Sequence, residues 1–372
     1  MGIVTGTTAV NPCNKLQEAL GKYMLNPAAQ TVPTGAYEAL TSAQNKGGFE
    51  VLPTEGAARL TSTSNRKLQL RFVPKICTTD GIAEMSECST DTVTNPLYAT
   101  ADVRVTLRHT WGFSVNEQTQ RDLCEGDAQV YADFFMAKYA TEGKGGLNKK
   151  LISPLAAAMG NYPVSGHDSI TTPKILPVVT SVGAINPAGL AVIDYDYLQM
   201  EQTKAPIVIG AGRLDFAALS AKYAGLTTGG INQANANLSY FRDTQVNAYF
   251  NDTNDHILTW TPGSIQLVEW FDFVGQFDKE YEMIVNGQRS IEKATTTIVT
   301  PDGVKWDVKM TYSCGVYQWV FQKWFDVIPL PSTAFTSSCQ NYKYALHYEL
   351  GCGDLSCADL TVATGYSGGH GI

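Results

Sequence analysis

The stretch 67-KLQLRFV-73, together with 101-ADVRVTLR-108, decides the fold of this 372-residue chain. Apolar and polar side chains alternate along both segments, which is the pattern of β-strands that bury one face. The apolar positions are Leu68, Leu70, Phe72, Val103, Val105 and Leu107. We therefore predict a long two-stranded hairpin, an arm that spans residues 66–113.

The charges of this arm are divided between its stems and its tip. The stems carry the basic residues Lys67, Arg71, Lys75, Arg104 and Arg108, and the tip carries the acidic residues Asp80, Glu84, Glu87 and Asp91. The connector from Ile76 to Thr100 contains no Lys or Arg. Because an isolated hairpin is at best marginally stable in water, we expect the arm to lie on a neighbouring copy of the chain, with these charged residues making contacts between subunits.

Composition argues against two classes of function. The net charge is −8 and the isoelectric point is about 5.2, whereas proteins that read nucleic acids cluster Lys and Arg to neutralise phosphates. The uncharged stretch Ile175–Ile193 contains Pro177, Asn186 and Pro187, which makes it a poor membrane-spanning helix. We expect neither sequence-specific nucleic-acid binding nor a membrane partner.

Signals of secretion are also weak. The opening sequence MGIVTGTTAVNPCNK has no basic region followed by an apolar core, as a secretory signal would. Eight cysteines are too sparse in a chain of this length for a disulfide scaffold. We expect synthesis in the cytosol and reduced thiols.

Helix signals mark the first half of the chain outside the arm. Residues 1–65 are polar and rich in Gly and Thr around one short helix, Lys15–Leu25, and are expected to need a partner surface to become ordered. Apolar residues at helical spacing predict a helix over Asp127–Ala140. Gly143–Gly146 is expected to interrupt it, and Leu147–Met159 resumes helical composition with Pro154 as a kink.

The second half alternates strand and helix patterns. Strands are expected at Pro206–Ile209 and His256–Trp260, and helices at Arg213–Ala224, Asn235–Phe250 and Ser264–Phe273, the last starting at the cap signal Thr261-Pro262. Ala294–Thr300, Lys305–Tyr312 and Val316–Phe325 then predict an antiparallel meander, because Pro301-Asp302-Gly303 and Ser313-Cys314-Gly315 are strong turn signals. The pattern predicts a mixed α/β lobe followed by a sheet.

Two glycine motifs match enzyme signatures without their required context. Gly210–Asp215 follows an apolar strand, as a dinucleotide-binding turn does, but Asp215 stands where that turn needs its third glycine. Gly365–Gly369 matches a nucleophile elbow, but only three residues follow it, too few for the downstream Asp and His partners. Neither motif predicts catalytic or cofactor-binding residues.

The remaining reactive side chains also favour a chain without catalysis. Cys352, Cys357 and His347 are too few for a structural zinc site, which takes four ligands. His167 and Asp168 are adjacent in a loop, too local to build a triad. Three acidic residues in a tyrosine-rich stretch are interpreted as solvated surface: Asp194, Asp196 and Glu201. We predict no enzyme activity, no metal and no cofactor.

The order of these elements resembles the major capsid proteins of tailed bacteriophages, which have the Hong Kong 97-type fold. Asn186–Gly189, Pro206–Gly210 and His256–Trp270 are similar to axial-lobe segments of that family, and Thr300–Trp306 with Lys309–Tyr312 is similar to its peripheral strands. The resemblance implies an α+β fold divided into an N-terminal arm (1–65), an extended hairpin loop (66–113), a spine helix region (114–174), an axial domain (175–284), peripheral strands (285–330), and a return strand with a C-terminal tail (331–372).

The resemblance also implies a function. Such a protein assembles with itself, as pentamers and hexamers, into an icosahedral shell that encloses double-stranded DNA without reading its sequence. The expected location is the virion, after assembly in the host cytoplasm. A separate scaffolding protein or none, a portal and decoration proteins are the further partners left open. Two alternatives also stay open: an encapsulin-like compartment shell, and an α/β enzyme that binds a nucleotide at Gly210–Asp215.

Overall fold

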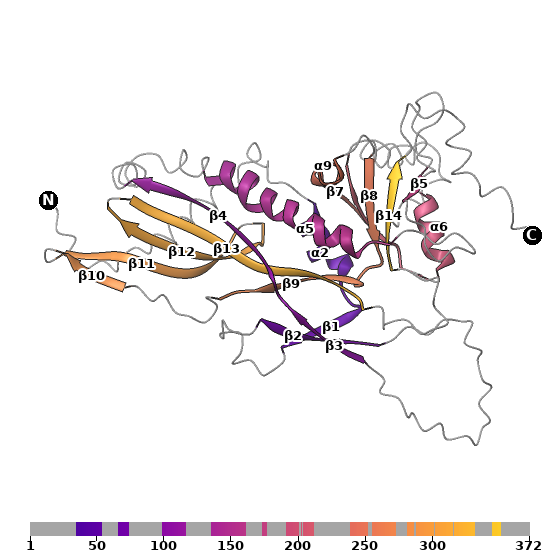
Figure 1. The fold of residues 1–372 in the computed structure, drawn as a ribbon, viewed down its shortest axis with the longest axis horizontal. Helices are drawn as coiled ribbons and strands as arrows, with labels where there is room; N and C mark the ends of the chain where they lie inside the picture. The colour runs from indigo at the N-terminus through magenta and orange to yellow at the C-terminus, as the bar shows by residue number, and fades with distance from the viewer. Residues whose placement is uncertain are drawn as a thin grey trace, which may run out of the picture.

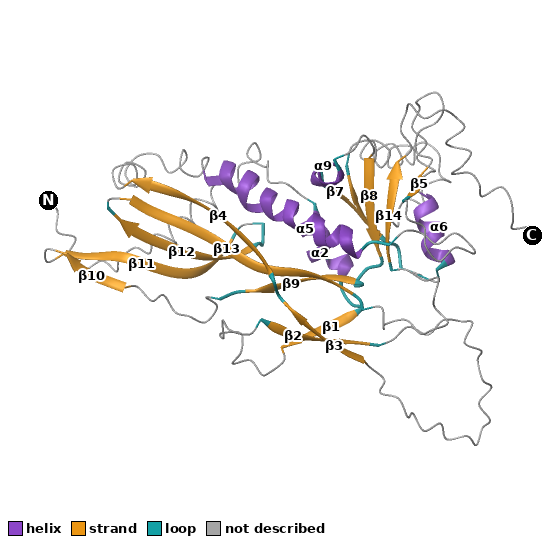
Figure 2. Ribbon diagram, viewed as in Figure 1, coloured by secondary structure: helices purple, strands orange, loops and turns teal. Residues whose placement is uncertain are grey.

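A computed structural model gives the fold of the chain. It describes residues 35–53, 66–73, 99–116, 135–160, 173–176, 191–200, 202, 204–211, 239–251, 255–272, 281–285, 288–300, 302–314, 316–331 and 344–350. Three β-sheets and several helices are present in these ranges (Figures 1 and 2). The predicted α+β class is confirmed.

The largest sheet has six strands and lies at one end of the molecule (Figure 1). Its strands are β10 (Tyr281–Val285), β11 (Gln288–Val299), β12 (Lys305–Ser313), β13 (Val316–Pro329), β4 (Leu107–Asn116) and β9 (Ile265–Trp270). The order is β10-β11-β12-β13-β4, and β9 pairs with the second half of β13. The predicted meander is β11, β12 and β13, and Gly303 at φ +85° makes the turn between the first two strands.

A second sheet of five strands stands at the other end (Figure 1). Its order is β5 (Lys174–Leu176), β14 (Ala345–Leu350), β8 (Asp255–Trp260), β6 (Ile207–Gly210) and β7 (Ser239–Arg242). Helix α9 (Gln245–Phe250) packs against β8 and β6. Helix α6 (Ala191–Gln199) supplies Ile193 and Tyr197 to a separate apolar cluster with Ile257 and Tyr348.

The root of the predicted arm is a three-stranded sheet, β1 (Phe49–Pro53), β2 (Lys67–Phe72) and β3 (Ala99–Arg104). Strands β2 and β3 pair antiparallel as predicted, with Lys67 opposite Arg104, whereas β1 is an additional strand that the sequence did not signal. Leu70 and Phe72 are buried against Val268 and Trp270 of β9. The described part of the arm therefore packs on its own chain, whereas the tip between β2 and β3 lies outside the described residues, so its contact with a neighbouring copy stays a prediction.

Helix α5 (Lys144–Ala158) runs along the six-stranded sheet toward the five-stranded one (Figure 1). It continues from a π-helical turn, η4 (Tyr139–Gly143), and contains Pro154. The predicted interruption at Gly143–Gly146 is wrong, because these glycines permit close packing inside a continuous helical segment. A Cβ at Gly146 would lie 2.8 Å from the His109 ring, and one at Gly143 would lie 2.7 Å from the Tyr139 ring.

Two helices predicted in the second half are wrong. Ser264–Phe273 contains strand β9, and Asn235–Phe250 contains strand β7 before the short helix α9. In β9, Ile265 faces the main apolar cluster while Val268 and Trp270 face the cluster under the arm. Both faces of β9 are apolar, so the strand lacks the alternation by which a strand is distinguished from a buried helix.

The sheets cross the boundaries predicted between segments. Strand β9 falls in the segment 175–284 and β4 begins in the segment 66–113, yet both pair with β13 in the six-stranded sheet. Helix α2 (Ala36–Thr41), followed by a 3-10 turn (Ala43–Asn45), lies in the segment 1–65 but is packed into the main apolar cluster. The expectation that this segment needs a partner surface therefore does not hold for residues 35–53. The predicted helices Lys15–Leu25 and Arg213–Ala224 lie outside the described residues.

Candidate functional site

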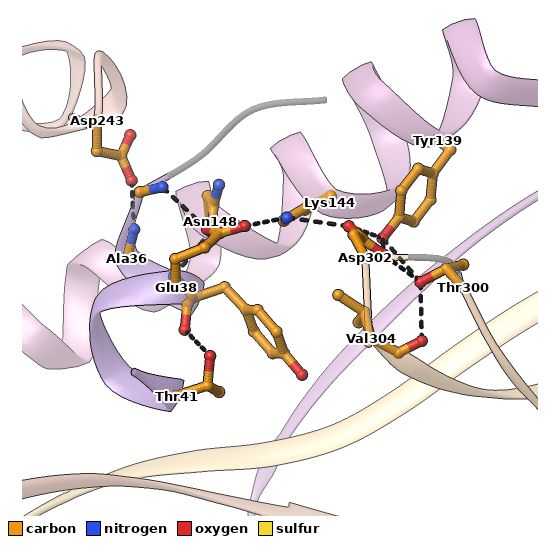
Figure 3. Close-up of polar contacts among 12 residues, drawn as sticks. Ala36, Glu38, Thr41, Tyr139, Lys144, Asn148, Asp243, Thr300, Asp302 and Val304 are labelled. Carbon is orange, nitrogen blue, oxygen red and sulfur yellow. Dashed lines mark hydrogen bonds and ion pairs between the residues drawn. The ribbon is translucent and has the colours of Figure 1, made fainter. Parts of the chain in front are cut away.

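Helix α2 is the centre of a buried polar junction (Figure 3). A helix of six residues has little stability by itself, and its first backbone N–H groups need partners. Side chains from three elements supply them. Glu38 Oε2 accepts from Gly35 N at 3.0 Å, Asp243 Oδ2 accepts from Ala36 N at 2.9 Å, and Asn148 Oδ1 accepts from Tyr37 N at 3.1 Å.

The Asp243 carboxylate serves two helices. Its other oxygen accepts from Gln245 N at 2.8 Å, at the start of α9, so one carboxylate joins the N-terminus of α2 to the N-terminus of α9. Burial raises the pKa of this carboxyl group, and the two backbone donors act in the opposite direction. The contact requires glycine at position 35, because a Cβ there would lie 2.2 Å from Asp243 Oδ2.

Lys144 of α5 connects α2 to the turn between β11 and β12. Its side chain is 3% exposed and forms ion pairs with Glu38 and, at 2.9 Å, with Asp302 (Figure 3). Tyr139 and Thr300 also donate hydroxyl hydrogen bonds to the Asp302 carboxylate. Burial alone would raise the pKa of Asp302, but the Lys144 ammonium group and these hydroxyl donors outweigh it, so the pKa is lowered. Burial raises the pKa of the Tyr139 hydroxyl, which therefore stays protonated as a donor.

A second buried lysine lies beside Tyr37 of α2. Lys323 of β13 is 0% exposed and forms an ion pair with Glu269 of β9. Its Nζ also donates to the Lys305 carbonyl at 3.0 Å and lies 4.9 Å from the centre of the Tyr37 ring. Burial lowers the pKa of Lys323, and Glu269 offsets part of this effect. The Tyr37 hydroxyl donates to Glu269 at 3.0 Å, which fastens α2 to the six-stranded sheet.

This junction connects the six-stranded sheet to the loop before α9 at the other end of the molecule. Its members come from α2, the π-helical turn and α5, the loop before α9, the β11–β12 turn, β9 and β13. Sequence reasoning missed the junction, because its partners are far apart in the chain, and Asp302, the one member singled out in a turn motif, was interpreted as a turn residue. Charges buried in this way fix positions, since each must meet its partner to remain charged away from water.

The structure describes four of the charged arm residues. Lys67, Arg71 and Arg104 are exposed on the outward face of the three-stranded sheet. Arg108 belongs to β4, where it is exposed and donates to Gln322 Oε1 at 2.8 Å. The remaining residues of the predicted contact set, Lys75, Asp80, Glu84, Glu87 and Asp91, lie outside the described residues.

Of the residues singled out in sequence motifs, Asp196, Gly210 and His347 each contact other residues of the fold. Asp196 is 0% exposed and accepts a hydrogen bond from the Tyr348 hydroxyl at 3.1 Å, so its interpretation as solvated surface is wrong. Gly210 ends β6, and its carbonyl accepts from Asp243 N. His347 contacts His256. Residues 212–215, Glu201, His167, Asp168 and the two motifs after residue 350 lie outside the described residues.

The described part of the chain shows neither a metal-binding cluster nor a membrane-spanning helix. No group of three or more His, Cys, Asp or Glu side chains there could hold a metal ion. None of the helices described is both long enough and apolar enough to cross a membrane.

Comparison with known proteins finds similarity in structure alone. No protein-family model and no curated protein sequence matches the chain. A chain from Mycobacterium phage Che8 is 12% identical, with 86% of this chain and 89% of that chain covered at a TM-score of 0.34. A virus-like particle from Pyrococcus furiosus is 9% identical, with 91% and 100% covered at a TM-score of 0.42. The capsid of Ralstonia phage GP4 is 9% identical, with 79% and 86% covered at a TM-score of 0.41.

Proposed function

We propose that this chain is the major capsid protein of a tailed bacteriophage, a structural protein whose copies form an icosahedral shell around the genome. The observation that supports this function is the arrangement of the elements. A β-rich end and an α/β end are joined by the long helix α5 and the junction at α2, and a separate three-stranded sheet packs on β9 (Figure 1).

A rigid subunit suits such a shell. The ion pairs of Lys144 tie α5 to α2 and to the β11–β12 turn, and the Lys323–Glu269 pair meets the Tyr37 side chain of α2 on the six-stranded sheet. The proposed partners are other copies of the chain in pentamers and hexamers, packaged double-stranded DNA without sequence-specific contacts, and a portal, decoration proteins or a scaffold. The proposed location is the virion.

Purification of the full chain followed by negative-stain microscopy and light scattering tests this function. Closed shells, or rings of five and six copies, are the expected result. A monomer at every salt concentration and pH would refute it. Shells from the producing cells that hold a protein cargo and no DNA would identify an encapsulin-like compartment instead, and micromolar binding of a nicotinamide or adenine nucleotide, lost in Gly212→Val, would favour an enzyme.

We also propose that the charged arm residues mediate contacts between subunits. Lys67, Arg71 and Arg104 point outward from a sheet whose other face is buried, so their replacement should leave the fold intact. Each exposed ion pair contributes only about 0.2–1 kcal/mol, but symmetry repeats the contact in every copy.

Charge reversal separates assembly from folding. The triple variant Lys67→Glu, Arg71→Glu, Arg104→Glu should keep the circular dichroism spectrum of the parent while shell yield in sedimentation falls and becomes more sensitive to salt. Lys149→Glu, at an exposed position of α5, is the matched control and should assemble normally. A second variant replaces residues 76–98 by Asn-Gly and keeps all of β3, which starts at Ala99. Normal shell yield in both arm variants would contradict the proposal.

A further inference from the structure

Two histidines share a hydrogen bond in the five-stranded sheet, outside the junction at α2. His256 of β8 and His347 of β14 lie on neighbouring antiparallel strands, and His256 Nδ1 is 3.0 Å from His347 Nε2. The His256 residue is 1% exposed. Phe250, the last residue of α9, stacks on both rings, with ring centres 4.1 Å from His256 and 4.5 Å from His347.

The histidine contact is one of several that hold helix α9 on the sheet, together with the Asp243 carboxylate at its N-terminus and its packing on α5. The helix has six residues, too few for a stable isolated helix, and it ends at Asn251 in the left-handed conformation, φ 54°. In this helix Val246 is buried and Phe250 is half-buried, and Asn247 Oδ1 accepts a hydrogen bond from His256 N at 2.9 Å. His256 of β8 therefore contacts α9 through both its backbone N–H group and its ring.

An N–H···N bond needs one donor and one acceptor. A neutral pair or a pair with one extra proton meets this need, because one ring nitrogen of the contact still has a lone pair. When both rings are protonated, both nitrogens of the contact carry hydrogen. Two donors and two positive charges then face each other across 3.0 Å, and the bond is lost.

The charged groups around the pair are few among the residues described. Glu349 of β14 lies 3.8 Å from His256 Nδ1 and offsets one positive charge. Asp255 of β8 accepts from Asn247 Nδ2, and α9 contributes no charged side chain. Strand β5, on the far side of β14, has Lys174 opposite Tyr348. Asp196 bonds to the Tyr348 hydroxyl and so lies on the opposite face of the sheet. Helix α5, which packs against α9, carries Lys149 at an exposed position.

We propose that the His256–His347 pair is an acid-sensitive latch that holds α9 on the five-stranded sheet. With one shared proton, the latch is closed and Phe250 covers both rings. With both rings protonated, the rings repel, the stack with Phe250 separates, and α9 leaves β8. The latch is a property of one subunit, so it stands whether or not the chain forms shells.

Hydrogen exchange measured by mass spectrometry on the purified full chain tests this latch. Peptides that cover α9 and β8 are compared at about pH 7.5 and about pH 5, the range over which imidazoles take up protons, with exchange corrected for the intrinsic effect of pH. The parent should show about tenfold faster local opening in acid, a loss of about 1.4 kcal/mol in opening free energy. Peptides from β12 and β13 are the internal control and should show no such change.

Two variants decide whether the histidine pair is the cause. His347→Gln keeps a polar group beside His256 but cannot take a second proton, so opening of α9 should become independent of pH. Glu349→Gln removes the carboxylate that offsets the first charge, so acid opening should begin at a higher pH than in the parent. Equal protection of the parent at both pH values, or acid opening in His347→Gln as large as in the parent, would overturn the proposal. If His347→Gln does not fold, an unchanged midpoint in Glu349→Gln would do so as well.

Discussion

Replacement of Lys144 by Met is the sharpest test of the junction at α2. The side chain of Lys144 is 3% exposed, and its partner Asp302 is 12% exposed. Removal of one member of a buried ion pair costs about 3–5 kcal/mol, because the other charge stays buried without a partner. Asp302 keeps its hydrogen bonds from Tyr139 and Thr300 in this variant, so we expect the lower end, about 3 kcal/mol.

A matched control lies one and a half turns earlier in the same helical segment. Lys138 is 30% exposed and pairs with Glu142, which is 51% exposed. An exposed pair of this spacing contributes about 0.3–0.5 kcal/mol. The two Lys→Met variants should therefore differ by about 2.5 kcal/mol, or about sixtyfold in the unfolding equilibrium, as each kcal/mol corresponds to about a fivefold change.

The assay is guanidinium unfolding of the unassembled chain, followed by tryptophan fluorescence. The pKa of Asp302 is lowered in the folded chain, so the stability from its pair with Lys144 is fully present above the ordinary value of 3.8 and is lost as pH falls through the folded value. The difference between parent and Lys144→Met should stay constant from about pH 7 to about pH 5 and shrink near about pH 3. A cost no larger than that of Lys138→Met would refute the reasoning.

Three further predictions concern the arm, a turn and a buried histidine. Leu70→Ala should destabilise the chain by about 2–5 kcal/mol because the side chain is fully buried. Arg71→Ala on the outward face should change stability by less than about 0.5 kcal/mol. Equal losses of stability in thermal melting would show that the sheet does not pack as described. Gly48→Ala should cost clearly more than Gly303→Ala, because both have positive φ but only at Gly48 would a Cβ meet backbone, at 2.1 Å; denaturant midpoints compare them. Burial lowers the pKa of His109, so the free energy of unfolding should fall as pH drops through the ordinary value of 6.5. In His109→Gln this fall between about pH 7.5 and about pH 5.5 should be smaller, as denaturant unfolding at the two pH values would show.

Period-two patterns predicted strands well wherever one face of the sheet is exposed. The pairing of β2 with β3 and the meander β11–β13 follow from alternation and turn residues, which are local signals. Strand β9 could not be distinguished from a helix, because the apolar clusters on its two faces come from distant parts of the chain. The strands β2, β3 and β11–β13 could be predicted because each buries one face, which produces the alternating pattern, and not from strand propensity alone.

The junction at α2 could not be predicted because its partners are not local. Lys144 meets Glu38 and Asp302, and nothing in the sequence near Lys144 distinguishes it from an exposed lysine such as Lys138. Glycines misled the helix prediction for a related reason, since the ring that packs on Gly146 belongs to His109 of β4. The charged arm residues were predicted to make contacts between subunits, which stays a prediction, and Lys67, Arg71 and Arg104 are exposed.

The pairing of β13 has a consequence for the order in which the chain folds during synthesis. Val316 pairs with Asn116, and Trp324 pairs with Trp270, so β4 and β9 both leave the ribosome before the strand that completes their hydrogen bonds exists. At about 5–20 residues per second, β4 waits about 10–40 seconds for β13. During this interval the nascent chain exposes strand edges and apolar side chains, which is the state in which chains associate wrongly. Premature termination before residue 316 should therefore yield aggregates, and chaperones that bind nascent chains should raise the yield of the full-length protein.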